Sequence, residues 1–315
     1  MNFFNIDCHV SVISDIKNIF TKLGHTVDNW SISGHRWVFN FAPCPSPIIN
    51  ADNWKSIDEK MVDDFYRNHK EELDKYEAFI CCYPPIFLKL FEKFNKPIIV
   101  VAATRYDYPV IDDPIRLSWL EDSLNNNKNL ILVANNEFDK KYCELFLKKE
   151  WQHIPSVCDY TNHKYKDTKK QSLVFSKFPI QTEHVLQSNL GKYSWEHLFS
   201  YKNIIHFPYN SSTMSIFEQY QAGMPLNFPD IDLAISLIKA GIPLFSEITF
   251  SNNNADRKSS NFLTKEWLSY SDFYNGTIEC SYFKSLEESL EVVIPKKNNK
   301  EKALNLWDNL LSSIL

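Results

Sequence analysis

The chain has 315 residues, of which 44% are hydrophobic, and a formal net charge of -5 from 34 basic and 39 acidic side chains. This balance argues against general nucleic-acid binding, and no apolar run approaches the ~18 residues of an integral membrane segment. The length favours two domains. Seven cysteines occur without zinc-ligand spacing, which predicts reduced thiols in a cytoplasmic protein.

Strands and helices are predicted to alternate over the first half of the chain. Apolar runs predict strands at residues 2–7, 25–30, 78–83, 97–102, 129–134 and 151–154. Helical periodicity predicts helices at residues 13–23, 52–76, 86–94, 114–124 and 137–148. This alternation predicts a doubly wound parallel sheet, whose ligands bind outside the carboxyl ends of the strands.

A polar stretch without periodicity at residues 155–171 predicts a linker to a second group of elements. Strands are predicted at residues 172–176, 204–207, 224–228 and 279–283. Helices are predicted at residues 194–201, 213–222, 230–239 and 285–293, and a final amphipathic helix runs to residue 315. Residues 246–276 carry no pattern that assigns an element.

Residues 203–230 form one strand–turn–helix–strand pattern, in which Gly223 ends the helix as a C-cap. The N-terminus of a helix carries unpaired N–H groups and a partial positive charge, so it suits a phosphate or diphosphate. Glu218, one turn into the helix, is placed to accept hydrogen bonds from a ribose diol. The turn and the start of the helix supply five polar side chains: Tyr209, Asn210, Ser211, Ser212 and Thr213.

The spacing of Thr213-Met-Ser-Ile-Phe-Glu218, four further residues and Gly223-Met-Pro225 resembles the C-terminal-domain signature of GT-B glycosyltransferases. In that family the helix N-terminus holds the nucleotide diphosphate and the Glu binds the ribose. The resemblance implies an α/β fold of two Rossmann-like domains with a cleft between them. The implied boundaries are residues 1–165 for the acceptor-side domain, 166–294 for the nucleotide-sugar-binding domain and 295–315 for a helix that crosses back. A helix packed on its own domain is the alternative for this last segment.

The resemblance also implies a reaction. The expected enzyme transfers a hexosyl or pentosyl group from a nucleotide-diphosphate sugar, such as a UDP- or GDP-sugar, to a carbohydrate acceptor in glycan biosynthesis. It is expected to be inverting and to need no metal or other cofactor, because helix dipoles and basic side chains stabilise the leaving group. Lys177 ends the first strand of the second half, where the family places a residue that reaches the donor phosphates.

Two further residues at strand ends are candidates for binding the nucleotide sugar. His206 ends a strand aimed at the same cleft, and its alternative is a histidine at the edge of the core. Arg105 follows a strand toward the cleft and is placed to contact phosphate or acceptor; pairing with Asp107 or Asp112 at the surface is equally consistent. Lys177 likewise has the alternative of an ordinary surface lysine.

For the catalytic base, the loop after the first strand offers His9 and Asp7. A histidine that a carboxylate orients is a workable base near neutral pH. Because the two residues are two positions apart, they face the same side of an extended chain. We therefore expect His9 to be the base and Asp7 its orienter or rival. A structural role for both, with Asp7 in a turn and His9 bonded to backbone, stays open.

Two local patterns have simpler interpretations. Ser215 and Glu218 fit a capping box, in which Glu218 would only satisfy a helix end. Asp230 and Asp232 match the D-x-D of metal-dependent transferases, but Asp230 follows Pro229 and precedes a helix, so a helix N-cap is the simpler interpretation. No metal site is therefore expected.

Two rival functions remain at this stage. A sugar-nucleotide epimerase of the same fold would act on the donor itself, and a non-catalytic module would bind the nucleotide sugar without turnover. The chain has only six glycines, and the loop after the first strand lacks the Gly-rich turn of many GT-B enzymes. The sequence therefore does not decide whether the first domain contacts the donor phosphates.

Overall fold

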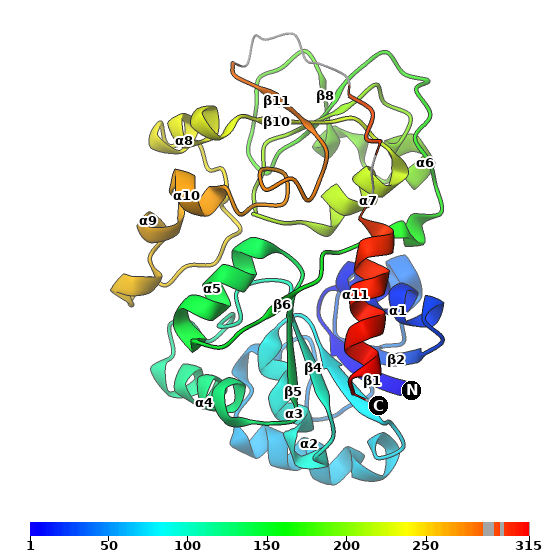
Figure 1. The fold of residues 1–315 in the computed structure, drawn as a ribbon, viewed down its shortest axis with the longest axis vertical. Coiled ribbons are helices and arrows are strands. Elements are labelled where there is room, and N and C mark those ends of the chain that lie inside the picture. The colour runs from blue at the N-terminus through cyan, green and yellow to red at the C-terminus, as the bar shows by residue number, and fades with distance from the viewer. Residues whose placement is uncertain (286–292, 297–298, 315) are drawn as a thin grey trace. The chain divides into compact units, whose positions relative to one another are not determined.

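A computed structural model describes residues 1–285, 293–296 and 299–314. The chain divides into two compact units, each with one parallel sheet and helices around it (Figure 1). Unit 1 comprises Met1–Pro155, Ser251–Ala255 and Ala303–Leu315. Unit 2 comprises Ser156–Phe250 and Asp256–Lys302.

The sheet of unit 1 has the order β2-β1-β3-β4-β5-β6, and all neighbouring strands are parallel. The chain moves from β1 outward to β2 and then returns to the other side of β1 at β3, so the order reverses between β1 and β3. The strands are β1 (Asn2–Asp7), β2 (Thr26–Ser31), β3 (Ala78–Cys81), β4 (Ile98–Ala102), β5 (Leu130–Ala134) and β6 (Gln152–His153).

Helices cover the sheet of unit 1 through aromatic contacts. Phe3 of β1 meets Phe20 of α1, and Trp307 of α11 packs edge-on against Phe20 with 5.2 Å between ring centroids. α11 therefore lies beside α1 (Figure 1). The helices are α1 (Val10–Lys22), α2 (Glu59–Leu73), α3 (Leu88–Phe91), α4 (Pro114–Asn126), α5 (Glu137–Leu147) and α11 (Lys300–Ser312).

The sheet of unit 2 has the order β11-β10-β9-β7-β8 and is parallel throughout. The first strand of this unit, β7, lies between the second strand, β8, and the third, β9, just as β1 lies between β2 and β3 in unit 1. The strand order therefore reverses between β7 and β9. The strands are β7 (Leu173–Phe175), β8 (Val185–Leu186), β9 (Ile204–His206), β10 (Leu226–Pro229) and β11 (Ser281–Phe283). The helices are α6 (Trp195–Leu198), α7 (Met214–Ala222), α8 (Ile231–Lys239), α9 (Ser259–Phe262) and α10 (Lys265–Leu268).

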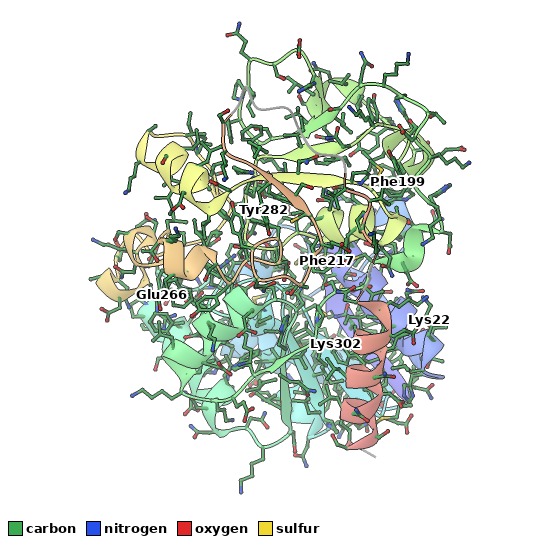
Figure 2. All side chains as sticks on the ribbon, turned by 45° about the horizontal axis from the view of Figure 1, so that its top comes forward. Lys22, Phe199, Phe217, Glu266, Tyr282 and Lys302 are labelled. Carbon is green, nitrogen blue, oxygen red and sulfur yellow. The ribbon has the colours of Figure 1, made fainter. Side chains whose placement is uncertain are left out.

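Stacked rings form much of the unit 2 core. Phe228 of β10 stacks on Phe273 with 4.4 Å between centroids, and on its other side it stacks on His206 at 4.8 Å. Phe217 of α7, labelled in Figure 2, is fully buried. The His206–Phe228 stack ties β9 to β10, and the contact of His206 Nε2 with Oε1 of Gln219 at 2.7 Å ties β9 to α7, so both fix the turn between β9 and α7.

The prediction of two Rossmann-like α/β units is confirmed by the two parallel sheets. The predicted helix at residues 52–76 is wrong in its first turns, because α2 begins at Glu59. Asp58 is extended there and its carboxylate accepts a hydrogen bond from the Met61 N–H, so it is the N-cap. The unassigned residues 246–276 contain α9 and α10. The predicted helix at 285–293 falls on residues 286–292, outside the described residues.

None of the helices described is long and apolar enough to cross a membrane.

Candidate functional site

The candidate site of unit 2 lies where its sheet reverses. β7 and β9 are neighbours there, with Phe175 and His206 in register. The chain leaves β7 through Lys177 and leaves β9 through Tyr209 and the following turn. In open parallel sheets, ligands bind outside the carboxyl ends of the strands at such a reversal. The Lys177 ammonium lies 4.8 Å from the centroid of the Tyr209 ring, so the structure brings these two predicted residues together.

Lys177 also forms an ion pair that the sequence did not indicate. Its Nζ lies 3.1 Å from Oε1 of Glu247, and both side chains are about half exposed. The Glu247 N–H donates to the Tyr209 carbonyl at 2.9 Å, which fixes the two residues to each other. Glu247 falls in the stretch without assignable pattern, so no signal could have found it. An anionic ligand at Lys177 would compete with the Glu247 carboxylate.

The turn after β9 is fixed by its own side chains. Oδ1 of Asn210 accepts hydrogen bonds from the N–H and the hydroxyl of Ser211 at 2.9 and 3.4 Å. Ser211 is fully buried, and its carbonyl accepts from the Asp272 N–H at 3.3 Å. Ser212 and Thr213 are half-buried and continue the turn into α7. The turn is therefore a preformed loop in which Ser212 and Thr213 remain partly accessible.

No side chain caps the N-terminus of α7. Thr213 is the N-cap in extended conformation, but its hydroxyl lies 3.1 Å from the Ser215 hydroxyl and makes no capping bond. The first turn carries no acidic residue. α1 is likewise without a side-chain cap. In contrast, side chains cap six helices of the described chain, α2, α4, α5, α6, α8 and α10, through Asp58, Asp113, Asn136, Ser194, Asp230 and Thr264. The short helices α3 and α9 also have no side-chain cap, but α1 and α7 are the ones that follow β1 and β9 beside the two sheet reversals, where N–H donors are available to an anion.

Glu218 does not serve the capping box. Because α7 begins at Met214, Glu218 is its fifth residue and lies beyond the capping position. The side chain is 4% exposed, and its Oε1 accepts a hydrogen bond from the Tyr160 hydroxyl. Tyr160 lies in a 3-10 turn, Asp159–Thr161, inside the stretch predicted as a linker. The capping alternative is therefore wrong, and Glu218 is held by a residue that the sequence did not indicate.

Tyr193 is a further neighbour of this site. The pKa of its phenol is raised mainly by burial, with smaller contributions from the charges of Glu218 and Tyr209. Its hydroxyl accepts a hydrogen bond from Nε2 of Gln187 at 2.9 Å. Tyr193 is therefore close enough to Glu218 and Tyr209 for their charges to act on its pKa. It belongs to a polar segment without periodicity, so its place could not be read from the sequence.

His206 lies in the core of unit 2, which is the alternative that the sequence left open. It is 3% exposed, it stacks on Phe228, and its Nε2 lies 2.7 Å from Oε1 of Gln219. Burial lowers its pKa to about 4, against the opposing effect of the Gln219 hydrogen bond. The expectation that His206 is aimed at a ligand is corrected: its ring is enclosed by Phe228, Phe175 and Gln219.

In unit 1, His9 lies at the reversal of the sheet. It is the N-cap residue of α1, and the neighbouring Cys8 N–H donates to the Tyr83 carbonyl at 3.2 Å. The His9 and Tyr83 rings meet edge-on, with 5.6 Å between centroids. Nδ1 of His9 is buried and has no hydrogen-bond partner among the described residues. Burial is the main cause that lowers the pKa of His9, so its imidazole is neutral at neutral pH.

Asp7 does not orient His9. It is 1% exposed, and its two carboxylate oxygens accept hydrogen bonds from Asn29 Nδ2 and Ser31 Oγ, both at 3.1 Å. Burial raises the pKa of Asp7 to about 7, although the bonds from Ser31 and Asn29 and the charge of Lys17 oppose this rise. The predicted carboxylate–imidazole pair is therefore wrong, because α1 starts directly after His9 and ends the strand alternation.

Arg105 is buried, and its predicted partners are wrong. The guanidinium is 0% exposed and pairs with Asp139, with 3.2 Å between Nη1 and Oδ1. Asp107 instead accepts from the Tyr142 hydroxyl at 2.8 Å, and Asp112 accepts from Ser251 and its neighbours. Arg105 thus ties the loop after β4 to the first turn of α5, and its enclosed side chain offers no donor at the surface of unit 1.

The D-x-D pair is engaged in structural contacts. Asp230 accepts a hydrogen bond from the Leu233 N–H at 2.7 Å as the N-cap of α8. Asp232 pairs with Lys265 of α10 at 2.7 and 2.9 Å. Within the residues that the structure describes, no three His, Cys, Asp or Glu side chains are grouped so that they could hold a metal ion.

No protein-family model matches the chain, and no curated protein matches it. It is similar to a solved structure described as Spinosyn Forosaminyltransferase SpnP, with 10% identity over 72% of this chain and 80% of that chain and a TM-score of 0.41. Spinosyn Rhamnosyltransferase SpnG has 9% identity, covers 86% and 90% of the two chains and has a TM-score of 0.38. A putative UDP-N-acetylglucosamine 2-epimerase from Listeria monocytogenes has 8% identity, covers 90% and 99%, and has a TM-score of 0.44. At these TM-scores the likeness assigns no activity.

Proposed function

We propose that the protein is a glycosyltransferase that transfers a sugar from a nucleotide-diphosphate sugar to a carbohydrate acceptor, without a metal ion and with inversion. The observation that supports this most is the grouping at the reversal of the unit 2 sheet. Lys177 lies beside Tyr209 at the start of the turn, α7 begins at the end of the turn without a side-chain cap, and Glu218 lies buried one turn into α7. These are the features that a diphosphate and a ribose require in turn.

In this proposal the diphosphate takes the N–H groups at the start of α7 together with Ser212 and Thr213. Lys177 leaves Glu247 and pairs with a phosphate oxygen, while its ammonium keeps its contact with the Tyr209 ring. Glu218 accepts from the ribose diol while Tyr160 keeps its carboxylate in place. The charge that develops on the leaving diphosphate is then met by fixed donors, which is the usual source of stabilisation in such a site.

For the acceptor, His9 is the proposed base and Asp7 its rival. A neutral imidazole accepts a proton without first losing one, so a lowered pKa keeps His9 in the basic form over a wide pH range. Asp7 has a pKa near neutrality but is enclosed by Asn29 and Ser31. His9 follows β1 beside the reversal between β1 and β3, whereas Asp7 is enclosed, and this supports His9 over Asp7 as the base.

The test is to incubate the protein with UDP-, GDP- and dTDP-sugars and to measure free nucleoside diphosphate and donor isomers by chromatography. Slow release of nucleoside diphosphate that Lys177→Ala reduces at least about tenfold, or 1.4 kcal/mol in transition-state free energy, would support a transferase. Lys192→Ala is the matched control, because Lys192 is an exposed lysine of the same unit. An isomerised donor would support the epimerase, and tight binding without turnover would support the non-catalytic module.

A further inference from the structure

A cavity of about 330 Å³ lies along the outer edge of the unit 1 sheet, beside the edge strand β2. Its walls come from β2, from α1 and from the segment at residues 40–42. Its lining does not include His9 or Tyr83, so it is distinct from the edge where the sheet reverses. The volume is at the lower end of the range for small-molecule sites, about 300–1,000 Å³, which fits a single ring.

The backbone of β2 presents a peptide group to this cavity. In a parallel strand both backbone groups of one residue face the same neighbour, and the side alternates along the chain. Thr26 and Ile32 donate to β1, whereas the Ser31 N–H and carbonyl bond to Ala42 and Cys44 on the outer side. The alternation therefore turns the N–H and carbonyl of Asn29 outward as well, into the cavity. A buried peptide group needs a hydrogen-bond partner, which water or a ligand supplies here.

Polar side chains on the walls are held in place with bonding capacity left. The Lys17 ammonium donates to Oδ1 of Asn29 at 2.9 Å and has two further N–H groups. The Tyr76 hydroxyl donates to Oδ2 of Asp28 at 2.9 Å, which leaves Oδ1 of this carboxylate as an acceptor. The cavity thus combines donors and acceptors at fixed positions, and its one lysine and one aspartate cancel in charge.

Aromatic faces complete the lining. Trp30 and Phe41 contribute flat apolar surfaces, and the Lys17 ammonium lies 5.1 Å from the centroid of Phe41. A ligand that matches these walls has an apolar face and a rim of groups that both donate and accept hydrogen bonds. A phosphate ester fits poorly, because the Asp28 carboxylate offsets the single cation.

We propose that this cavity binds one neutral pyranose ring, with a C–H face against Trp30 or Phe41 and hydroxyls toward Lys17, Asp28 and the peptide of Asn29. The proposal goes beyond the transfer reaction and does not depend on it, since none of the residues proposed to bind the donor lines the cavity.

The test is saturation-transfer NMR on the full chain with methyl glucopyranoside, methyl galactopyranoside, methyl mannopyranoside and N-acetylglucosamine. At least one should bind saturably with a Kd of about 1–10 mM, and excess UDP should leave that binding unchanged. Ala42→Trp should abolish the binding, because Ala42 is an exposed residue of the cavity wall whose enlargement fills it. Ala51→Trp, at an exposed alanine outside the cavity, should bind like the wild type.

Lys17→Met should weaken the binding at least about tenfold, the effect of losing a charge-assisted hydrogen bond. Lys22→Met is its matched control, because Lys22 is an exposed lysine at the end of the same helix (Figure 2). Absence of binding by all four sugars up to about 50 mM, or equal binding by Ala42→Trp, would overturn the proposal. Binding of inorganic phosphate in place of the sugars would also overturn it and make the cavity an anion site.

Discussion

The hydroxyl of Tyr160 donates a hydrogen bond to Oε1 of Glu218, a buried carboxylate 58 positions further along the chain. This bond ties the 3-10 turn before β7 to the helix after β9. This bond holds the carboxylate in one orientation. The proposed ribose contact therefore depends on a residue that need not touch the nucleotide.

Replacing this hydroxyl should weaken nucleotide binding. We expect Tyr160→Phe to reduce UDP or GDP affinity about threefold to tenfold, which is ~1 kcal/mol for one hydrogen bond that fixes a binding group. Glu218→Gln should have at least this effect, and the double variant should lose less than the sum, because both changes remove one interaction. Calorimetric titration measures all three. Tyr165→Phe loses a tyrosine hydrogen bond of the same unit, to the Lys202 carbonyl, and should bind normally. Equal affinity of Tyr160→Phe and wild type would remove Tyr160 from the site.

The turn after β9 should be sensitive at Ser212. Ser211 is fully buried, so a bulky residue there would disturb packing, whereas Ser212 is half-buried and tests ligand contact. Ser212→Leu should weaken UDP or GDP binding at least about tenfold, or 1.4 kcal/mol, because it obstructs the N–H groups of α7. Ser236→Leu, at an exposed serine of α8, is the control. Unchanged affinity in a folded Ser212→Leu variant would show that the diphosphate does not bind at this turn.

The pH dependence of transfer should reveal His9. Because burial lowers its pKa below the usual 6.5, the imidazole is neutral and basic at neutral pH and becomes protonated only in more acidic solution. The rate should therefore be level near pH 7 and fall only in solution more acidic than an ordinary imidazole requires. His9→Ala should reduce transfer about 10²–10⁴-fold, abolish this acidic limb and leave nucleotide affinity within about twofold. If the rate of the His9→Ala variant still falls in acidic solution, Asp7, whose pKa is about 7, would be the catalytic base instead.

Asp7 should make stability fall as pH rises. Its pKa is about 7 in the folded chain against 3.8 in an ordinary carboxyl, so between these values the folded state binds the extra proton. The stabilisation of the folded state by this bound proton of Asp7 is complete below about pH 4 and is lost as pH rises through 7. Asp7→Asn should remove this dependence and stabilise the protein at pH 8 by about 1 kcal/mol or more, as measured by urea unfolding. The same pH slope in both proteins would contradict this account.

Chelation should not stop the reaction. We expect the same turnover with EDTA and with added magnesium or manganese, because Asp230 caps α8 and Asp232 pairs with Lys265. Asp230→Ala should instead lower stability by about 1 kcal/mol, the usual effect of losing an N-cap, and leave turnover per folded molecule unchanged. Turnover that EDTA abolishes and manganese restores would contradict this prediction.

The sequence predicts those parts of the fold that short-range patterns determine. Strand β1 and helix α7 were located to within a residue, because apolar runs, Gly223 and the polar turn mark their ends. The strand ends also placed Lys177 and Tyr209 at one edge, since the carboxyl ends of parallel strands share a side. What depends on partners from distant segments could not be predicted. Asp7 is held by Asn29 and Ser31, and no local pattern encodes those hydrogen bonds.

Residues that act from irregular segments were missed for the same reason. Tyr160, Tyr193 and Glu247 come from stretches without periodicity, where spacing carries no information about direction. His206 and Arg105 show the opposite error, because a strand end does not say whether a side chain turns toward solvent or into the core. Their burial among Gln219, Phe228 and Asp139 follows from packing of the whole unit.

The contact between Phe20 and Trp307 has a consequence for synthesis on the ribosome. The first helix of unit 1 is α1 (Val10–Lys22) and its last is α11 (Lys300–Ser312), and nearly all of unit 2 is made in between. A nascent chain can therefore complete unit 2 while one side of α1 still lacks its cover. Until residues 303–312 emerge, the aromatic surface at Phe20 stays open to chaperones or to other nascent chains. Yield from cells is thus expected to depend on the timing of this last segment.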